Sequence, residues 1–142
     1  MVTLGQLLDR KGHGVHAVTP QAAVIEAVQA MADKHVGALL VMEGAVLRGI
    51  VSERDYARKV VLLGRGSSDT PVSDIMSSPV VTIGPEKSVE DAMRAMTDKR
   101  IRHLPVVQGD KVLGVVSIGD LVKCVIEDQR HLIEDLQQYI QG

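Results

Sequence analysis

The stretch Gly49-Ile50-Val51-Ser52-Glu53-Arg54-Asp55 recurs 65 positions later as Gly114-Val115-Val116-Ser117-Ile118-Gly119-Asp120. Both copies consist of a glycine, two aliphatic residues, a serine, two variable residues and an aspartate. The same shift places Ala27-Val28-Gln29-Ala30-Met31 on Ala92-Met93-Arg94-Ala95-Met96 without a gap. Because glycine, serine and aspartate agree as well as aliphatic residues, the chain is interpreted as a tandem duplication.

Each copy opens with a short apolar stretch that leads into a helix. The stretches Val15–Val18 and Val80–Ile83 are predicted strands. Proline marks the helix starts that follow, at Pro20 and at Pro85, and Ser88-x-x-Asp91 adds a capping-box pattern in the second copy. Apolar residues then recur at i, i+4 and i+7, at Val24, Val28 and Met31 and again at Val89, Met93 and Met96. This spacing predicts an amphipathic helix in each copy, with the methionines in the core.

A hairpin and a second helix complete each copy. Two apolar runs are separated by Glu43-Gly44 in the first copy and by Gln108-Gly109-Asp110 in the second, and these are hairpin-turn signals. A second helix is expected to begin near Glu53 and near Ile118. The order β-α-β-β-α, present twice, predicts a mixed α/β (α+β) fold.

The expected organisation follows from the two copies. It comprises an N-terminal segment 1–14, a first unit 15–63, a linker 64–79, a second unit 80–126 and a C-terminal helical extension 127–142.

Composition excludes several classes of function. A net charge of −2 over 142 residues, with two tyrosines and no other aromatic residue, argues against a nucleic-acid partner. No apolar run reaches the roughly 18 residues of a membrane span, and the N-terminus lacks the pattern of a signal peptide. The single cysteine, Cys124, fits a reducing compartment. We therefore expect a cytoplasmic protein without a membrane or nucleic-acid partner.

The repeated Ser-x-x-Asp element has two interpretations. At a helix start the serine oxygen and the aspartate carboxylate can each accept a backbone N–H of the first turn, which makes a capping box. The same carboxylate, at a strand-to-helix junction, could accept the two hydroxyls of a ribose, while the helix start favours a nearby anion. The two interpretations do not exclude each other.

The repeated signature, together with Ile101-Arg102-His103-Leu104-Pro105-Val106-Val107, resembles a pair of cystathionine-β-synthase (CBS) domains, also called a Bateman module. The resemblance covers about 15–125, and the full length is similar to small stand-alone bacterial CBS-pair proteins assigned to signal transduction. It implies that the two units pack about a pseudo-twofold axis and bind adenosyl ligands in the clefts between them.

The resemblance also implies roles for particular residues. Asp120 and Asp55 would each hold a ribose, with Ser117 and Ser52 beside the ribose or phosphate. The adenine would meet the backbone near Val18-Thr19 and Val81-Thr82, and basic side chains at Arg102-His103 would face the phosphates. The first copy departs from this pattern because it has Gly37 and Ala38 at the equivalent positions and carries its cations at Arg54 and Arg58 instead. Unequal clefts are therefore expected.

The function implied by the resemblance is that of a regulatory sensor that signals to a partner protein. Its ligand would be AMP in the first place, with ADP, ATP, NAD(H) and S-adenosylmethionine as further candidates, and no cofactor would be required. No nucleophile–base constellation and no metal-ligand spacing stand out, so neither catalysis nor a metal site is expected. The alternative is a structural dimerisation or interaction module without a physiological nucleotide.

The C-terminal segment predicts self-association. Val125, Leu132, Leu136 and Ile140 form an apolar stripe along a long helix. Together with the leucines of Leu4-Gly5-Gln6-Leu7-Leu8, this stripe is a candidate dimer seam. We expect a homodimer.

Overall fold

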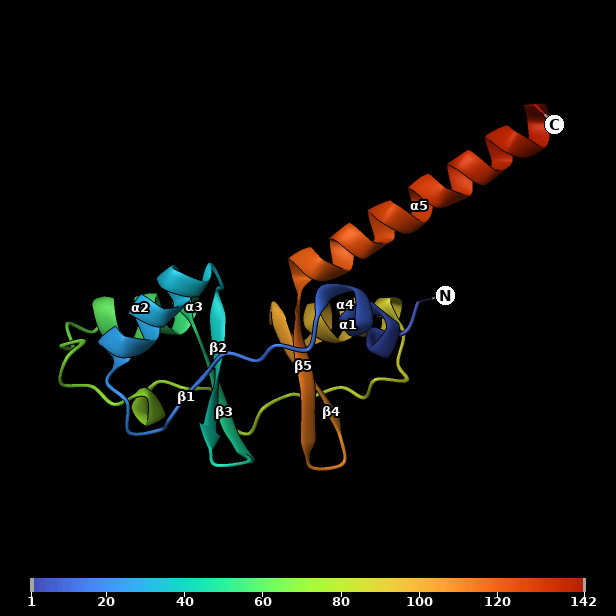
Figure 1. Cartoon of the computed structure of the whole chain (residues 1–142). Coiled ribbons are helices and arrows are strands. Elements are labelled where there is room, and N and C mark those ends of the chain that lie inside the picture. Colours follow the sequence, from blue (N-terminus) through green and yellow to red (C-terminus); the bar gives the residue numbers. More distant parts are fainter. Residues whose placement is uncertain (1, 142) are drawn as a thin grey trace. The chain divides into compact units, whose positions relative to one another are not determined.

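The computed structural model describes residues 2–141 and divides into two compact units (Figure 1). Unit 1 combines the chain up to His13 with Thr82–Gly109 and the residues from Leu113 onward. Unit 2 consists of Gly14–Val81 and Asp110–Val112.

Unit 2 contains the first copy of the repeat. Its elements are β1 (Ala17–Val18), α2 (Val24–Lys34), β2 (Ala38–Glu43), β3 (Val46–Ser52), α3 (Glu53–Tyr56), the π-helix η1 (Ala57–Val61) and the 3₁₀ helix η2 (Val72–Asp74). The sheet order is β1-β2-β3, with β1 parallel and β3 antiparallel to β2. The face of α2 that carries Val24, Ala27 and Met31 is buried against strand residues such as Val41 and Val51. The predicted amphipathic helix and hairpin are thus confirmed in the first copy.

Unit 1 contains the second copy. Its elements are α1 (Leu4–Lys11), α4 (Val89–Lys99), β4 (His103–Gln108), β5 (Lys111–Ser117) and α5 (Ile118–Gln141). The predicted capping box begins α4, because the Asp91 N–H donates to Ser88 Oγ at 3.1 Å and the Ser88 N–H donates to Asp91 Oδ2 at 3.1 Å. Met96 is buried in the core, as the helical spacing predicted.

The prediction of a strand at Val80–Ile83 is wrong. Only Ile83 pairs there, in an isolated parallel bridge with Val106. In the first copy the equivalent pairing continues for one more step, because the Leu40 N–H donates to the His16 carbonyl at 3.1 Å. Pro105 stands 65 positions after Leu40 and has no N–H to donate, so the second copy cannot make this bond. The missing donor shortens the strand to a single bridge.

A segment from outside the repeat completes each unit. Thr3 forms an antiparallel bridge with Ser88 in unit 1. Pro71 forms the corresponding bridge with Ala23 in unit 2, and Ala23 lies 65 positions before Ser88. The N-terminal segment therefore occupies in unit 1 the position that the segment around Pro71 and η2 occupies in unit 2.

The leucines of α1 belong to the core of unit 1. Leu4 and Leu8 are fully buried and Leu7 is almost so, in one cluster with Val89 and Leu104. The expectation that these leucines line a dimer seam is therefore wrong. An eight-residue helix buries little on its own, and tertiary packing directs this apolar face into its own unit.

Candidate functional site

Both Ser-x-x-Asp elements form capping boxes at the junction of a strand and a helix. In unit 1 the Ser117 N–H donates to Asp120 Oδ2 at 2.8 Å, and the Asp120 N–H donates to Ser117 Oγ at 3.1 Å. In unit 2 the corresponding bonds join Ser52 and Asp55 at 2.9 and 3.2 Å. The capping interpretation is thus confirmed for both copies, and it fixes each carboxylate at the end of β3 or β5.

A lysine lies against each of these carboxylates. Lys11, at the end of α1, places its Nζ 2.6 Å from Asp120 Oδ2 and donates to the Val115 carbonyl at 2.6 Å. In unit 2, Lys59 Nζ lies 3.3 Å from Asp55 Oδ1 and donates to the Ile75 carbonyl at 2.9 Å.

Sequence reasoning missed both lysines. Lys59 could have been found, because it lies four residues after Asp55 on a helix. Lys11 gave no such signal, because 109 residues separate it from Asp120.

The environment keeps Asp120 ionised. Burial of the carboxyl would raise its pKa, but the hydrogen bonds from Lys11 and Ser117 and the positive charge of Lys11 outweigh burial, so the pKa of Asp120 lies below its ordinary value. A carboxylate that is negative at neutral pH can accept hydroxyl hydrogen bonds, as a ribose would require.

The two carboxylates differ in how their oxygens are used. Among residues 2–141, every hydrogen bond that Asp120 accepts ends on Oδ2. Asp55 accepts its serine bonds on Oδ2 and has Lys59 beside Oδ1. Asp120 Oδ1 therefore accepts none of these hydrogen bonds. In Asp55, by contrast, Ser52 donates to Oδ2 and Lys59 lies beside Oδ1.

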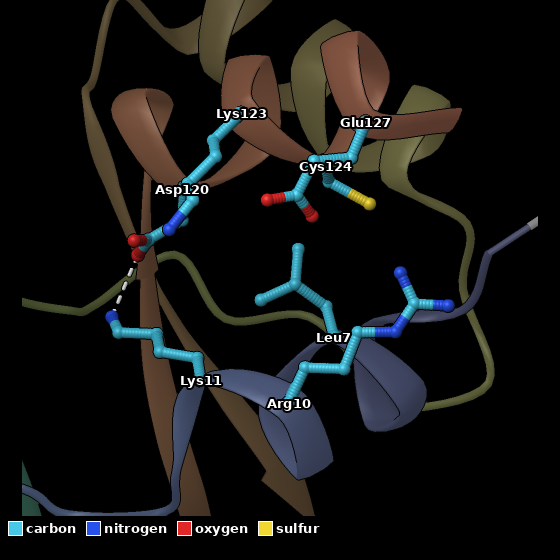
Figure 2. A pocket seen from close by; sticks show the side chains of 7 residues that line it. All are labelled: Leu7, Arg10, Lys11, Asp120, Lys123, Cys124 and Glu127. Atoms are coloured by element: carbon cyan, nitrogen blue, oxygen red, sulfur yellow. Dashed lines mark hydrogen bonds and ion pairs between the residues drawn. The ribbon is translucent and has the colours of Figure 1, made fainter. Parts of the chain in front are cut away.

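A groove of about 360 Å³ lies beside Asp120, between α1 and α5 of unit 1. Figure 2 shows its side chains, with Lys11 reaching up from α1 to Asp120 on α5. The groove is lined by Leu7, Arg10, Lys11, Asp120, Lys123, Cys124 and Glu127. Three of these residues are cationic and two are acidic, so an anionic group can be neutralised there.

Two further predicted residues of unit 1 lie near the start of α5. The Arg102 carbonyl accepts the N–H of Ile118, the first residue of α5, at 2.9 Å, and His103 is the next residue and begins β4. In unit 2 the Gly37 carbonyl accepts the Glu53 N–H at 3.1 Å in the same way. The same backbone hydrogen bond therefore holds the helix start in both copies. Only the second copy has a basic side chain at the accepting residue, because Arg102 stands where the first copy has Gly37.

The remaining residues predicted to contact a nucleotide are divided between the two units. Val18 ends β1 in unit 2, Thr19 follows it, and Arg54 is exposed in α3. Val81 and Thr82 are exposed neighbours at the boundary of the two units, Val81 in unit 2 and Thr82 in unit 1. Hydrogen bonds at the start of α5 in unit 1 thus involve Asp120, Ser117 and the Arg102 carbonyl. In unit 2 they connect Asp55 with Ser52 at the start of α3.

The comparison with known families agrees with the repeat. The family model of the CBS domain matches residues 12–62 and 72–127 of this chain. The chain belongs to the CBS-domain family. It holds two CBS domains, and each contains one strand-to-helix junction with its capping-box aspartate.

Similar proteins also contain CBS domains. A protein from Burkholderia ambifaria with CBS domains, provisionally assigned to signal transduction, is 47% identical, with a TM-score of 0.87 over 90% of this chain and 96% of that one. The mitochondrial CBS domain-containing protein CBSX3 of Arabidopsis thaliana is 40% identical over 149 residues, which cover 99% of this chain and 72% of CBSX3. The CBS domain protein PAE2072 of Pyrobaculum aerophilum, solved in complex with AMP, is 27% identical, with a TM-score of 0.74 over 84% of this chain and 89% of that one.

Within residues 2–141, no cluster of three or more His, Cys, Asp or Glu side chains could hold a metal ion, and no helix is long and apolar enough to cross a membrane. Burial raises the pKa of the Cys124 thiol, and the nearby Asp128 carboxylate adds to this effect. The thiol is therefore protonated at neutral pH and is a poor nucleophile.

The Lys11–Asp120 pair predicts a pH dependence of stability. Because the pKa of folded Asp120 is lowered, its stabilising contribution is complete above the unfolded value of about 3.9 and is lost as the pH falls through the folded value. Lys11→Met should raise the pKa of Asp120 and lower stability at pH 6 more than at pH 3. Urea denaturation at the two pH values measures this difference. Lys123→Met, which removes a charge from the same groove, is the control, and equal losses for Lys11→Met at both pH values would contradict the prediction.

Proposed function

We propose that this CBS pair is a non-catalytic regulatory module that binds an adenosyl nucleotide and signals to a partner protein. AMP is the leading ligand, and ADP, ATP, NAD(H) and S-adenosylmethionine are the other candidates. No cofactor is required for this role, and the module acts as a homodimer.

One observation carries the proposal. Asp120 is an ionised carboxylate held at the end of β5, and its Oδ1 accepts none of the hydrogen bonds found among residues 2–141. Capping the helix thus leaves an acceptor for a ribose hydroxyl. The Ser117 hydroxyl stands at the same carboxylate, because its Oγ accepts from the Asp120 N–H and its side chain also hydrogen-bonds the Asp120 carboxyl.

The cations near Asp120 supply the second requirement of a nucleotide, which is neutralisation of its phosphates. Arg10 and Lys123 line the groove in addition to Lys11, which pairs with Asp120, and Arg102 stands at the start of the same helix. The AMP complex of PAE2072 supports the choice of ligand class. Asp55 is the proposed ribose acceptor of the first copy, with Ser52 and Arg54 beside it, and its neighbour Lys59 makes it the weaker of the two.

The adenine contacts belong to the same proposal. The backbone near Val18-Thr19 and near Val81-Thr82 would meet the base, and His103 would stand with Arg102 at the phosphates. The sparse aromatic content means that aliphatic side chains would enclose the ring.

A second candidate function is a structural interaction module without a nucleotide. It is favoured by the capping boxes, which by themselves account for a serine and an aspartate at both helix starts. The two candidates differ in whether a ligand stabilises the fold.

Thermal unfolding separates the two functions. A nucleotide at about 100 times its dissociation constant should stabilise the folded protein by roughly 2.7 kcal/mol and raise its melting temperature. The measurement is a melting curve of nucleotide-free protein with each of the five ligands, and inorganic phosphate and GMP serve as controls. A flat response to all five at millimolar concentration would favour the structural module.

A further inference from the structure

A lysine connects the capping-box aspartate of each unit to the segment that completes that unit. In unit 2, Lys59 lies 3.3 Å from Asp55 Oδ1 and donates to the carbonyl of Ile75, which directly follows η2. In unit 1 the lysine belongs to the completing segment itself, because Lys11 is the last residue of α1 and donates to Asp120 Oδ2 at 2.6 Å (Figure 2). Each aspartate therefore has a cation at an oxygen that a ribose would use.

The end of α1 is held by a side chain where the equivalent segment of unit 2 is held by backbone. The Ile50 carbonyl in β3 accepts the Ser77 N–H at 2.8 Å, and the Ile50 N–H donates to the Ser77 carbonyl at 3.1 Å. Val115 stands 65 positions after Ile50, and its carbonyl accepts Lys11 Nζ at 2.6 Å instead. Two backbone hydrogen bonds fix the segment of unit 2, whereas an ammonium group on a flexible stem can exchange one acceptor for another.

Asp120 Oδ2 has no place left for a further donor. It accepts the Ser117 N–H at 2.8 Å and the Lys11 ammonium at 2.6 Å, and two donors fill the lone pairs of one carboxylate oxygen. The hydroxyls of a ribose stand on adjacent carbon atoms, so they match the two oxygens of a carboxylate, one hydroxyl to each. One hydroxyl can bond Oδ1, which accepts none of the hydrogen bonds found among residues 2–141. The other can bond Oδ2 only when Lys11 leaves it.

We propose that the Lys11–Asp120 contact is autoinhibitory: a nucleotide that binds Asp120 through both ribose hydroxyls displaces the Lys11 ammonium, and the last turn of α1 loosens. This inference rests on the proposed function, because it concerns the regulation of the same site. The Ser117 N–H is not displaced, since the backbone at the start of α5 fixes it. The start of α1 stays in place, because Leu4 and Leu8 are fully buried in the core of unit 1.

The change is confined to the C-terminal end of α1. Lys11 is followed by Gly12, which has a φ of +109° and donates its N–H to the Leu8 carbonyl at 2.6 Å. His13 Nδ1 lies 2.8 Å from the Leu113 carbonyl and holds the chain just beyond the helix. The residues at positions 9–17 are all exposed, so little burial supports this end of the helix. Exchange of the Gly12 amide with solvent therefore reports whether the end of α1 is closed or open.

Hydrogen exchange of the Gly12 amide, measured by nuclear magnetic resonance, tests the displacement. Saturating AMP should speed this exchange several-fold and leave the exchange of the Leu8 amide unchanged. Saturating 2′-deoxy-AMP is the matched control, because its single ribose hydroxyl needs only Oδ1, and the Gly12 amide should then exchange as in the free protein. The inference is overturned if bound AMP leaves the Gly12 exchange unchanged or slows it, or if 2′-deoxy-AMP speeds it as much as AMP does.

Removal of the ammonium group provides a second test. Adenosine is the probe, because it carries the ribose without a phosphate that could attract Lys11. Lys11→Met should bind adenosine about two- to fivefold more tightly than the wild type, since no ion pair has to be broken. Lys99→Met, at the exposed end of α4, is the control and should leave the affinity unchanged. Calorimetric titration at neutral pH compares the proteins, and equal or weaker binding by Lys11→Met would overturn the inference.

The inference and the proposed function fail in different ways. If neither the wild type nor Lys11→Met binds AMP or adenosine at millimolar concentration, both the nucleotide site and the autoinhibitory contact are overturned. If AMP binds the wild type without a change at the Gly12 amide, and Lys11→Met binds adenosine no more tightly, only the autoinhibitory contact is overturned.

Discussion

Leu8→Ala is expected to lower the free energy of unfolding of unit 1 by about 2–5 kcal/mol. Leu8 is fully buried, and its side chain packs so tightly on the hairpin that a Cβ at Gly114 would lie 2.8 Å from Leu8 Cδ2. Removing the isobutyl group leaves a cavity between α1 and β5. The change also weakens the attachment of α1, and with it the position of Lys11 beside Asp120.

Urea denaturation followed by circular dichroism measures this loss. Leu62→Ala is the matched control, because Leu62 is 76% exposed and its truncation should change stability by less than about 0.5 kcal/mol. If Leu8→Ala is no more destabilising than Leu62→Ala, then α1 is not part of the core of unit 1.

Asp120→Asn is expected to weaken nucleotide binding by about 1.5–3 kcal/mol, the range for a hydrogen bond to a charged group. An amide has a single acceptor oxygen, so it cannot accept the Ser117 N–H, as Oδ2 does, and also accept a ribose hydroxyl at the position of Oδ1. Affinity should therefore fall by roughly tenfold or more. Loss of the favourable charge at the helix start should also cost stability, by about 0.3–1 kcal/mol.

Two controls isolate the ligand effect from the capping effect. Asp91→Asn disturbs a capping box of the same kind in α4 and should reduce stability without changing affinity. Asp55→Asn should weaken binding less than Asp120→Asn does, because Lys59 already lies beside Asp55 Oδ1. Calorimetric titration with AMP compares the proteins. Equal affinities for the wild type and all three variants would contradict both the ribose assignment and the ranking of the two carboxylates.

The local elements could be predicted from the sequence. The capping box at Ser88 and Asp91, the apolar face of α2 and the hairpin turns each depend on residues a few positions apart, and all three are present. The Ser-x-x-Asp elements were also found, because capping geometry is encoded within four residues. The loss of the strand at Val80–Ile83 was in principle readable from Pro105, but only once the parallel partner of that strand was known.

The sequence by itself determined the duplication, the amphipathic helices and hairpins of both copies, and the two candidate carboxylates. Only the tertiary structure decided that α1 completes the second copy of the repeat and that Lys11 neutralises Asp120. The physical reason is that an apolar helix face shows that the helix will be buried, but it does not show which surface the helix will pack against. For Leu4, Leu7 and Leu8 the choice between their own unit and a dimer seam depended on shape complementarity with α4 and β5, more than 80 residues away in the chain.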